Sequence, residues 1–148
     1  MPTTDHYRTL VSEIPYGIER KIYQILCNHV GENHAISLRD LAVLTFGHPT
    51  EYRLINGERV YDFGDIERQT RKVIEILRRE YHIPVMANSG KAGCWLAADA
   101  DELEKTITEM VNRAHNMLEV ANQLRQARIP SHDPWSCNKQ TIMQEVLF

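Results

Sequence analysis

Seven apolar residues follow one another at alternating spacings of four and three toward the C-terminus, and this spacing constrains the fold more than any other feature of the sequence. It persists over three heptads, so it predicts one long helix over residues 98–128 with a continuous apolar seam. Asp99 and acidic residues in the first turn favour the helix start through the helix dipole. The seam residues are Leu103, Ile107, Met110, Ala114, Met117, Ala121 and Leu124.

A free amphipathic helix of about thirty residues needs a surface that covers its apolar face. Two interpretations of the seam are open. The helix packs back on its own domain and the seam is part of the core, or the helix pairs with its copy in a second chain. Ala114 and Ala121 would let two such helices approach closely, so we favour a homodimer with this segment as the dimerisation helix.

Residues 18–97 carry the pattern of a compact α+β domain. Ser37 with Asp40 three residues later is a typical helix N-cap, and Asp65 is the expected N-cap of a later helix that Pro84 ends. Asn56-Gly57 lies between two short apolar segments and is a strong hairpin signal. The predicted helices are 18–30, 38–46 and 65–83, and the predicted strands are 52–55, 58–61, 84–87 and 93–97.

Composition and the positions of Gly and Pro residues suggest four segments. They are an N-terminal arm (1–17), the α+β domain (18–97), the long helix (98–128) and a flexible tail (129–148). With 148 residues, 43% hydrophobic and 25% charged, the chain is typical of globular proteins. Its apolar runs are too short for a membrane span, no signal peptide is evident, and the three cysteines lie far apart. We therefore expect reduced thiols and a cytoplasmic location.

The order helix, short extended link, helix, helix, two-stranded hairpin resembles a winged helix-turn-helix. The segment DIERQTRKVIEILRREYHIPVMANSGKAGCWLA is similar to the recognition helix and wing of winged-helix DNA-binding proteins of the small phage and prokaryotic type, in which one long helix follows the domain. The resemblance implies an α+β winged helix with a β-hairpin inserted between the second and third helices. It also implies that the third helix enters the DNA major groove while the wing contacts the adjoining backbone or minor groove.

The charge of this segment agrees with such a role. From Ile66 to Lys91 there are six basic and three acidic residues, in a chain whose net charge is −3. Arg68 and Gln69 would read bases. Phosphate contacts would come from Arg71, Lys72, Arg78 and Lys91. The alternative is a solvated helix whose arginines pair with Glu67, Glu75 and Glu80 at helical spacing. The candidate DNA-binding residues are Arg68, Gln69, Arg71, Lys72, Arg78, Asn88, Ser89 and Lys91.

The hairpin predicted over residues 52–61 has no assigned role. Winged helices join their second and third helices by a short turn, whereas Gly47 to Gly64 intervene here. The hairpin would contact DNA through Arg53 and Arg59, serve as a dimer arm, or cover the core as a lid. An isolated two-stranded hairpin is only marginally stable, so we expect its apolar residues to have a surface to cover.

The last residues of the chain carry a second resemblance. Gln144, Leu147 and Phe148 are similar to the peptide with which bacterial replication and repair proteins dock on the DNA sliding clamp, although Glu145 stands where that motif more often has Leu. The resemblance implies a sliding clamp or another replication protein as a partner. The alternative is a short apolar helix that covers the domain or the dimer partner.

Together these features favour a sequence-specific binder of double-stranded DNA, acting as a transcriptional regulator or as an accessory protein in phage or plasmid replication. The alternative is a protein–protein adaptor that uses the winged domain and the clamp-binding-like tail. The sequence contains no phosphate-binding loop, zinc-protease, hydrolase or dinucleotide motif, so we expect neither enzymatic activity nor a cofactor or metal.

Overall fold

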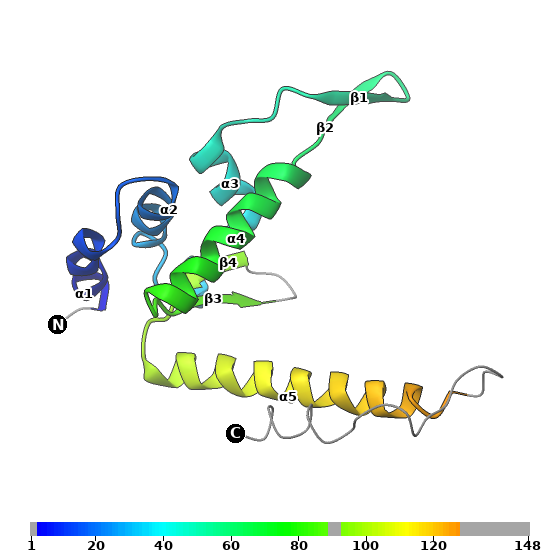
Figure 1. Cartoon of the computed structure of the whole chain (residues 1–148). Helices are drawn as coiled ribbons and strands as arrows, with labels where there is room; N and C mark the ends of the chain where they lie inside the picture. Colours follow the sequence, from blue (N-terminus) through cyan, green and yellow to red (C-terminus); the bar gives the residue numbers. More distant parts are fainter. Residues whose placement is uncertain (1–2, 89–92, 128–148) are drawn as a thin grey trace. The chain divides into compact units, whose positions relative to one another are not determined.

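A computed structural model describes residues 3–88 and 93–127 of the chain (Figure 1). The chain divides into two compact units, residues 1–103 and residues 104–148. The first unit is an α+β domain that holds two small antiparallel sheets. The described part of the second unit continues the long helix α5 (Ala100–Leu124), which begins within the first unit.

From α2 onward the α-helices and strands of the first unit follow the predicted order, whereas α1 was not predicted. In the described residues, two short 3-10 helices (Leu10–Glu13 and Glu32–His34) accompany the α-helices. The elements before α5 are α1 (Thr3–Thr9), α2 (Ile18–Leu26), α3 (Leu38–Phe46), β1 (Tyr52–Ile55), β2 (Glu58–Tyr61), α4 (Gly64–Glu80), β3 (Val85–Asn88) and β4 (Gly93–Leu96).

The main core lies where α2, α3 and α4 pack together beside the β3–β4 hairpin. Each helix turns one apolar face inward, since its buried residues recur at helical spacing. The largest fully buried side chains include Tyr23 and Leu26 on α2, Leu41 on α3 and Leu77 on α4. α4 is therefore fixed along one side, and its opposite side is left for other contacts.

The N-terminal segment, predicted as an arm, contributes to this core. Tyr7 and Ile14 are buried, and the Tyr7 hydroxyl donates to the Ala97 carbonyl oxygen at 2.6 Å. The Tyr23 hydroxyl in turn donates to the Tyr7 carbonyl oxygen. Burial, with a smaller effect from the nearby Glu102, raises the pKa of Tyr7 to about 12, so this hydroxyl remains a donor at neutral pH. α1 is thus tied to the end of the β3–β4 hairpin.

The bounds of α3 agree with the sequence, whereas α2, α4 and α5 all end earlier than predicted, α4 at Glu80 and α5 at Leu124. The Ser37 hydroxyl accepts a hydrogen bond from the Asp40 amide at 3.0 Å and confirms the predicted N-cap of α3. α4 begins at Gly64 with Phe63, not Asp65, at the N-cap position, and the Asp62 carboxylate accepts from the Gly64 amide at 2.9 Å. α2 ends at Leu26 rather than at residue 30.

The early end of α2 frees the next residues to pair with β4. The His29 carbonyl accepts from the Leu96 amide and the Gly31 amide donates to the Leu96 carbonyl, both at 2.8 Å. Further along, Ile36 and Cys94 exchange two backbone hydrogen bonds, of 2.9 and 2.7 Å. β4 is thus hydrogen-bonded on one edge to β3 and on the other to the segment 29–36.

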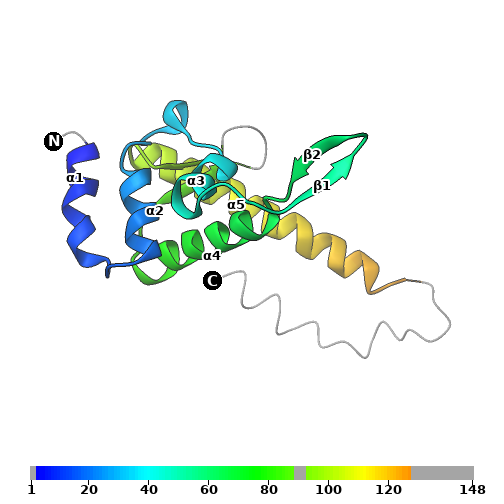
Figure 2. The same ribbon diagram turned by 90° about the horizontal axis from the view of Figure 1, so that it is seen from above.

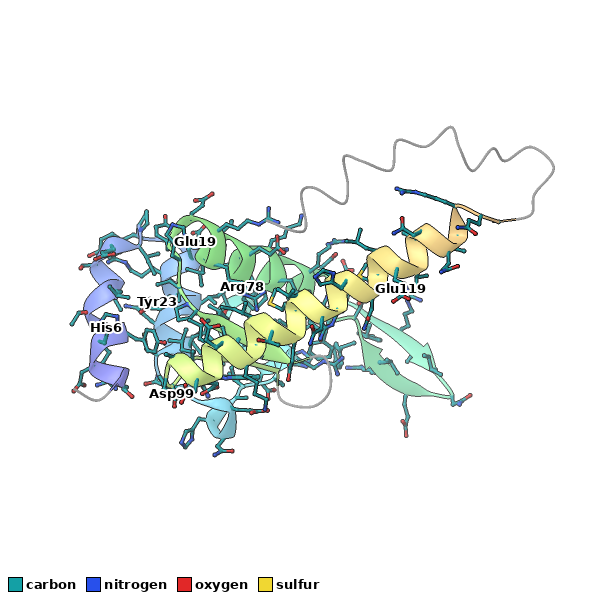
Figure 3. The ribbon with its side chains drawn as sticks, turned by 90° about the horizontal axis from the view of Figure 1, so that it is seen from below. His6, Glu19, Tyr23, Arg78, Asp99 and Glu119 are labelled. Carbon is teal, nitrogen blue, oxygen red and sulfur yellow. The ribbon has the colours of Figure 1, made fainter. Side chains whose placement is uncertain are left out.

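A second, smaller cluster lies at the junction with α5. Met86, Trp95 and Ala97 are buried there, and Leu103 packs against them. Asp99, labelled at the start of α5 in Figure 3, accepts a hydrogen bond from the Glu102 amide at 2.8 Å. The Glu102 carboxylate accepts from the Trp95 indole and from the Ala98 amide. Leu103, expected in the dimer seam, therefore belongs to the packing of the first unit.

The pairing of β4 with Ile36 leaves no room for a side chain at Gly93. A Cβ atom there would lie 2.1 Å from the Ile36 carbonyl oxygen, and the φ of Gly93 is +77°. We expect Gly93→Ala to lower the free energy of unfolding by about 2–4 kcal/mol, measured by urea denaturation.

Gly47 provides a matched control, because its φ is +87° but a Cβ atom would meet nothing within 4 Å. Gly47→Ala should cost only about 1 kcal/mol. Equal losses in the two variants would contradict the close approach of Gly93 and Ile36.

Candidate nucleic-acid interface

α4 presents two chemically opposite faces. Thr70, Val73, Ile74 and Leu77 form the buried face. On the other side, Arg68, Lys72, Glu75 and Arg79 follow one another at helical spacing, and all four are exposed. Arg71, also exposed, lies beside this row on the side of the β3–β4 hairpin, and it lines a hollow together with Ala87 and Gly93. The outward face is therefore mainly cationic.

The ion pairs on this face are weak. Arg68 contacts Asp65, and Arg79 lies 3.5 Å from Glu75, and the two arginine side chains are 66% and 79% exposed. Pairs this exposed contribute about 0–1 kcal/mol, so a phosphate group can replace the carboxylate partner at little cost. Arg71 and Lys72 form no salt bridge within the described part of the chain. These two side chains are thus the most available cations of α4.

Arg78 has a different environment from the other candidates. Its side chain is partly buried, and its Nε donates to the Val85 carbonyl oxygen at 2.8 Å. Burial lowers the pKa of this guanidinium, although Arg remains charged at neutral pH. Figure 3 labels Arg78 on α4. The structure gives this residue a positioning role, since it ties α4 to β3.

The remaining candidates lie at the margins. Gln69 is exposed. Because consecutive residues of an α-helix differ by about 100°, it points away from Arg68 and toward one border of the buried face. Asn88 is the last residue of β3. Ser89 and Lys91 lie outside the described residues. Arg68, Arg71 and Lys72 are therefore brought together on one helix face, whereas Gln69 flanks it on the side away from Arg71.

Arg39, in the first turn of α3, is a cation that the sequence analysis missed. Its guanidinium lies over the Phe63 ring, 4.3 Å from the ring centre, and pairs with Glu67 at 3.1 Å. Its side chain is nonetheless 60% exposed. A basic residue directly after an N-cap serine was the available signal. Arg39 extends the cationic surface from α4 to the start of α3.

A hollow of about 410 Å³ lies between α4, the start of α3 and the β3–β4 hairpin. Arg71, Glu75 and Arg78 line it, together with the buried Cys94. Burial raises the pKa of the Cys94 thiol, so the thiol stays protonated at neutral pH and is a poor nucleophile. Over residues 3–88 and 93–127, no three His, Cys, Asp or Glu side chains gather as metal ligands would.

The β1–β2 hairpin matches its predicted bounds and extends away from the helices of the first unit (Figure 2). Asn56 and Gly57 both have positive φ, as the two-residue turn requires. Of its strand residues only Tyr61 is partly buried, so the hairpin does not cover the core as a lid. His48 packs edge-on against Tyr61 and Phe63 and anchors the base of the hairpin.

The seam of α5 beyond Leu103 is largely exposed. Met110, Met117 and Leu124 each show more than half of their surface, and Ile107 shows 42%. Ala121 is exposed and Ala114 is partly buried. The tail residues Gln144, Leu147 and Phe148 lie outside the described part of the chain.

Comparisons with known proteins identify no relative. No protein-family model matches the chain, and neither a curated protein nor a solved structure does. None of the described helices is both long and apolar enough to cross a membrane.

The different environments of Arg78 and Arg79 give a direct test. Arg78→Ala should lower the free energy of unfolding by about 1–3 kcal/mol, because it removes a charged hydrogen bond and the packing of the side-chain stem. Arg79→Ala, one residue on, should change it by less than about 0.5 kcal/mol. Thermal and urea unfolding measure both values, and the reverse order would contradict the role assigned to Arg78.

Proposed function

We propose that the chain is a winged-helix protein that binds double-stranded DNA through α4 and the β3–β4 hairpin. The fold order supports this proposal, because α2, α3 and α4 are followed by an antiparallel hairpin whose β4 also pairs with the segment between α2 and α3. In a winged helix these are the three helices, the short first strand and the wing. The β1–β2 hairpin is then an insertion before the recognition helix.

The observation that carries the proposal is the exposed cationic face of α4. Arg68, Arg71, Lys72 and Arg79 lie on the side of the helix away from the core, and only exposed carboxylates of α4 itself pair with them in the described residues. An α-helix fits the major groove of B-DNA, where such side chains reach phosphates along both walls. The alternative, a solvated helix whose arginines pair with acidic residues of the same helix, does not account for Arg71 and Lys72, which form no salt bridge in the described residues.

In this proposal some side chains contact phosphates and others contact bases. Arg71 and Lys72 supply phosphate contacts, and Arg39 adds a further cation from α3. Arg68 lies in the second turn of α4, where a recognition helix meets base edges, and its guanidinium is suited to bonding guanine O6 and N7 together. Gln69 contacts DNA only if the groove wall approaches α4 from the side away from Arg71. Sequence-specific binding of this kind suits a transcriptional regulator or a replication accessory protein.

A protein–protein adaptor is the second candidate function, and the β1–β2 hairpin favours it. Leu54, Ile55 and Val60 are exposed on this projecting element. Ile55 and Val60 lie on one face of the hairpin and Leu54 on the other. Exposed apolar side chains on a projecting element are available for a protein contact. In this alternative the domain binds a partner protein and the tail peptide recruits a replication protein.

Duplex binding across a salt series tests the proposal. Fluorescence anisotropy of the full chain with a random duplex should show affinity that falls steeply between about 50 and 200 mM salt. Arg71→Ala/Lys72→Ala should weaken binding and reduce the salt slope by about two, one unit for each lost phosphate contact. Lys105→Ala, which removes one positive charge from α5, is the control and should leave the slope unchanged.

Two outcomes would contradict DNA binding by α4. The first is no duplex binding at about 50 mM salt, which would favour the adaptor. The second is a salt slope that the double substitution leaves intact, which would move the DNA contact to another surface.

A further inference from the structure

The exposed seam of α5 has the composition of a helix–helix interface. Six residues, Ile107 to Leu124 at spacings of three and four, lie on one stripe of the helix, and Val111, Leu118 and Val120 widen it. Ile107, Met110, Val111, Met117, Val120 and Leu124 are all more than 40% exposed. So wide an apolar stripe on a helix calls for an apolar partner surface.

We propose that a second copy of this chain covers the stripe, and that the two α5 helices run antiparallel in one defined register. In this register Ile107 faces the partner's Leu124, Met110 faces the partner's Ala121, and Ala114 faces the partner's Met117. The twofold symmetry of a homodimer repeats each contact, so the six seam residues form six layers. No described seam residue beyond Leu103 is left without a counterpart.

Side-chain size selects this direction. The seam alternates small and large residues, since Ala114 and Ala121 lie between Met110, Met117 and Leu124. Two parallel helices in register would stack alanine on alanine and methionine on methionine, giving alternately thin and thick layers. The antiparallel register puts a large residue against a small one in the four central layers, and it matches Ile with Leu at the ends. Layers of equal volume fill an interface at the density of a protein interior.

Charge selects the same direction. The residues that flank the seam on one side are Glu104, Val111, Leu118 and Arg125. In the antiparallel register Glu104 lies beside the partner's Arg125, and Val111 lies beside the partner's Leu118. A parallel pair would instead place Arg113 beside Leu118 and Val120 beside Arg125, with no opposite charges adjacent. A contact between opposite charges across the seam, that of Glu104 with Arg125, is therefore formed only when the helices are antiparallel.

Cysteine cross-linking distinguishes the two directions. The experiment uses the full chain with Cys137→Ser, since Cys27 and Cys94 are buried. Mild oxidation of an equimolar mixture of Met110→Cys and an affinity-tagged Ala121→Cys should give a disulfide-linked heterodimer. Neither variant alone should cross-link, because antiparallel pairing separates like positions by about 16 Å along the axis. Sedimentation should give the parent chain twice its mass of 17.2 kDa.

Several results would overturn the proposal. Cross-linking of Ala121→Cys alone would show parallel helices. A mixture that yields no heterodimer although the chain is dimeric would exclude the register. A chain that sediments as a monomer at micromolar concentration would exclude the interface.

Charge exchange gives an independent measure. Glu104→Arg and Arg125→Glu should each weaken the dimer roughly fivefold, and the double variant should restore it. The two positions are too far apart on one helix to interact within a chain, so recovery requires the antiparallel partner. Glu119→Arg, on the polar side of α5, is the control and should leave the dissociation constant unchanged. Absence of recovery in the double variant would contradict the register.

The antiparallel dimer and the binding of DNA by α4 are independent of each other. A dimer that binds no duplex would overturn DNA binding alone, whereas a monomer with a steep salt slope would overturn the antiparallel pair alone.

Discussion

The domain depends on the hydrogen bonds that hold β4 between β3 and the segment that precedes α3. Ile36 and Cys94 are 58 residues apart, yet their backbones exchange two hydrogen bonds at 2.9 and 2.7 Å. Everything between them, from α3 through the β1–β2 hairpin to α4, is closed into one loop by this pairing. The approach is so close that only glycine fits at position 93. The orientation of α4, and with it the cationic face, follows from this closure.

The division of α4 into a core face and a cationic face then has a simple origin. Buried residues at helical spacing fix the rotation of the helix about its axis, and this rotation decides which cations reach solvent. Arg78 falls at the boundary and is used to hold β3, while Arg68, Lys72 and Arg79 fall opposite the core. Residues of one chemical type thus have different roles because they differ by a fraction of a turn.

Local patterns allowed much of this arrangement to be predicted. The Ser37 cap, the Asn56-Gly57 turn and the strands around residues 88–93 each depend on neighbours within a few residues, so their signals lie in short segments. Other features depend on distant contacts. Tyr7 packs in the core, where Ala97 accepts its hydrogen bond, and residues 29–31, which follow the early end of α2, pair with β4. Of the candidate site, the exposure of Arg71 and Lys72 follows from periodicity, whereas the tie of Arg78 to Val85 and the place of Arg39 over Phe63 require the fold.

The first turn of α5 is part of the packing of the first unit and is also the start of the helix that continues into the second unit. Glu102 receives the Trp95 indole hydrogen bond and Leu103 covers the cluster around Met86, although the helix itself continues into the second unit. A fragment cut at the end of β4 would leave a buried indole donor unpaired and an apolar surface open to water. The smallest fragment able to fold as the first unit must therefore keep one turn of the next helix. For the same reason, exchange of this helix between related genes would preserve the domain only if the crossover fell after Leu103, inside the helix and not at its start.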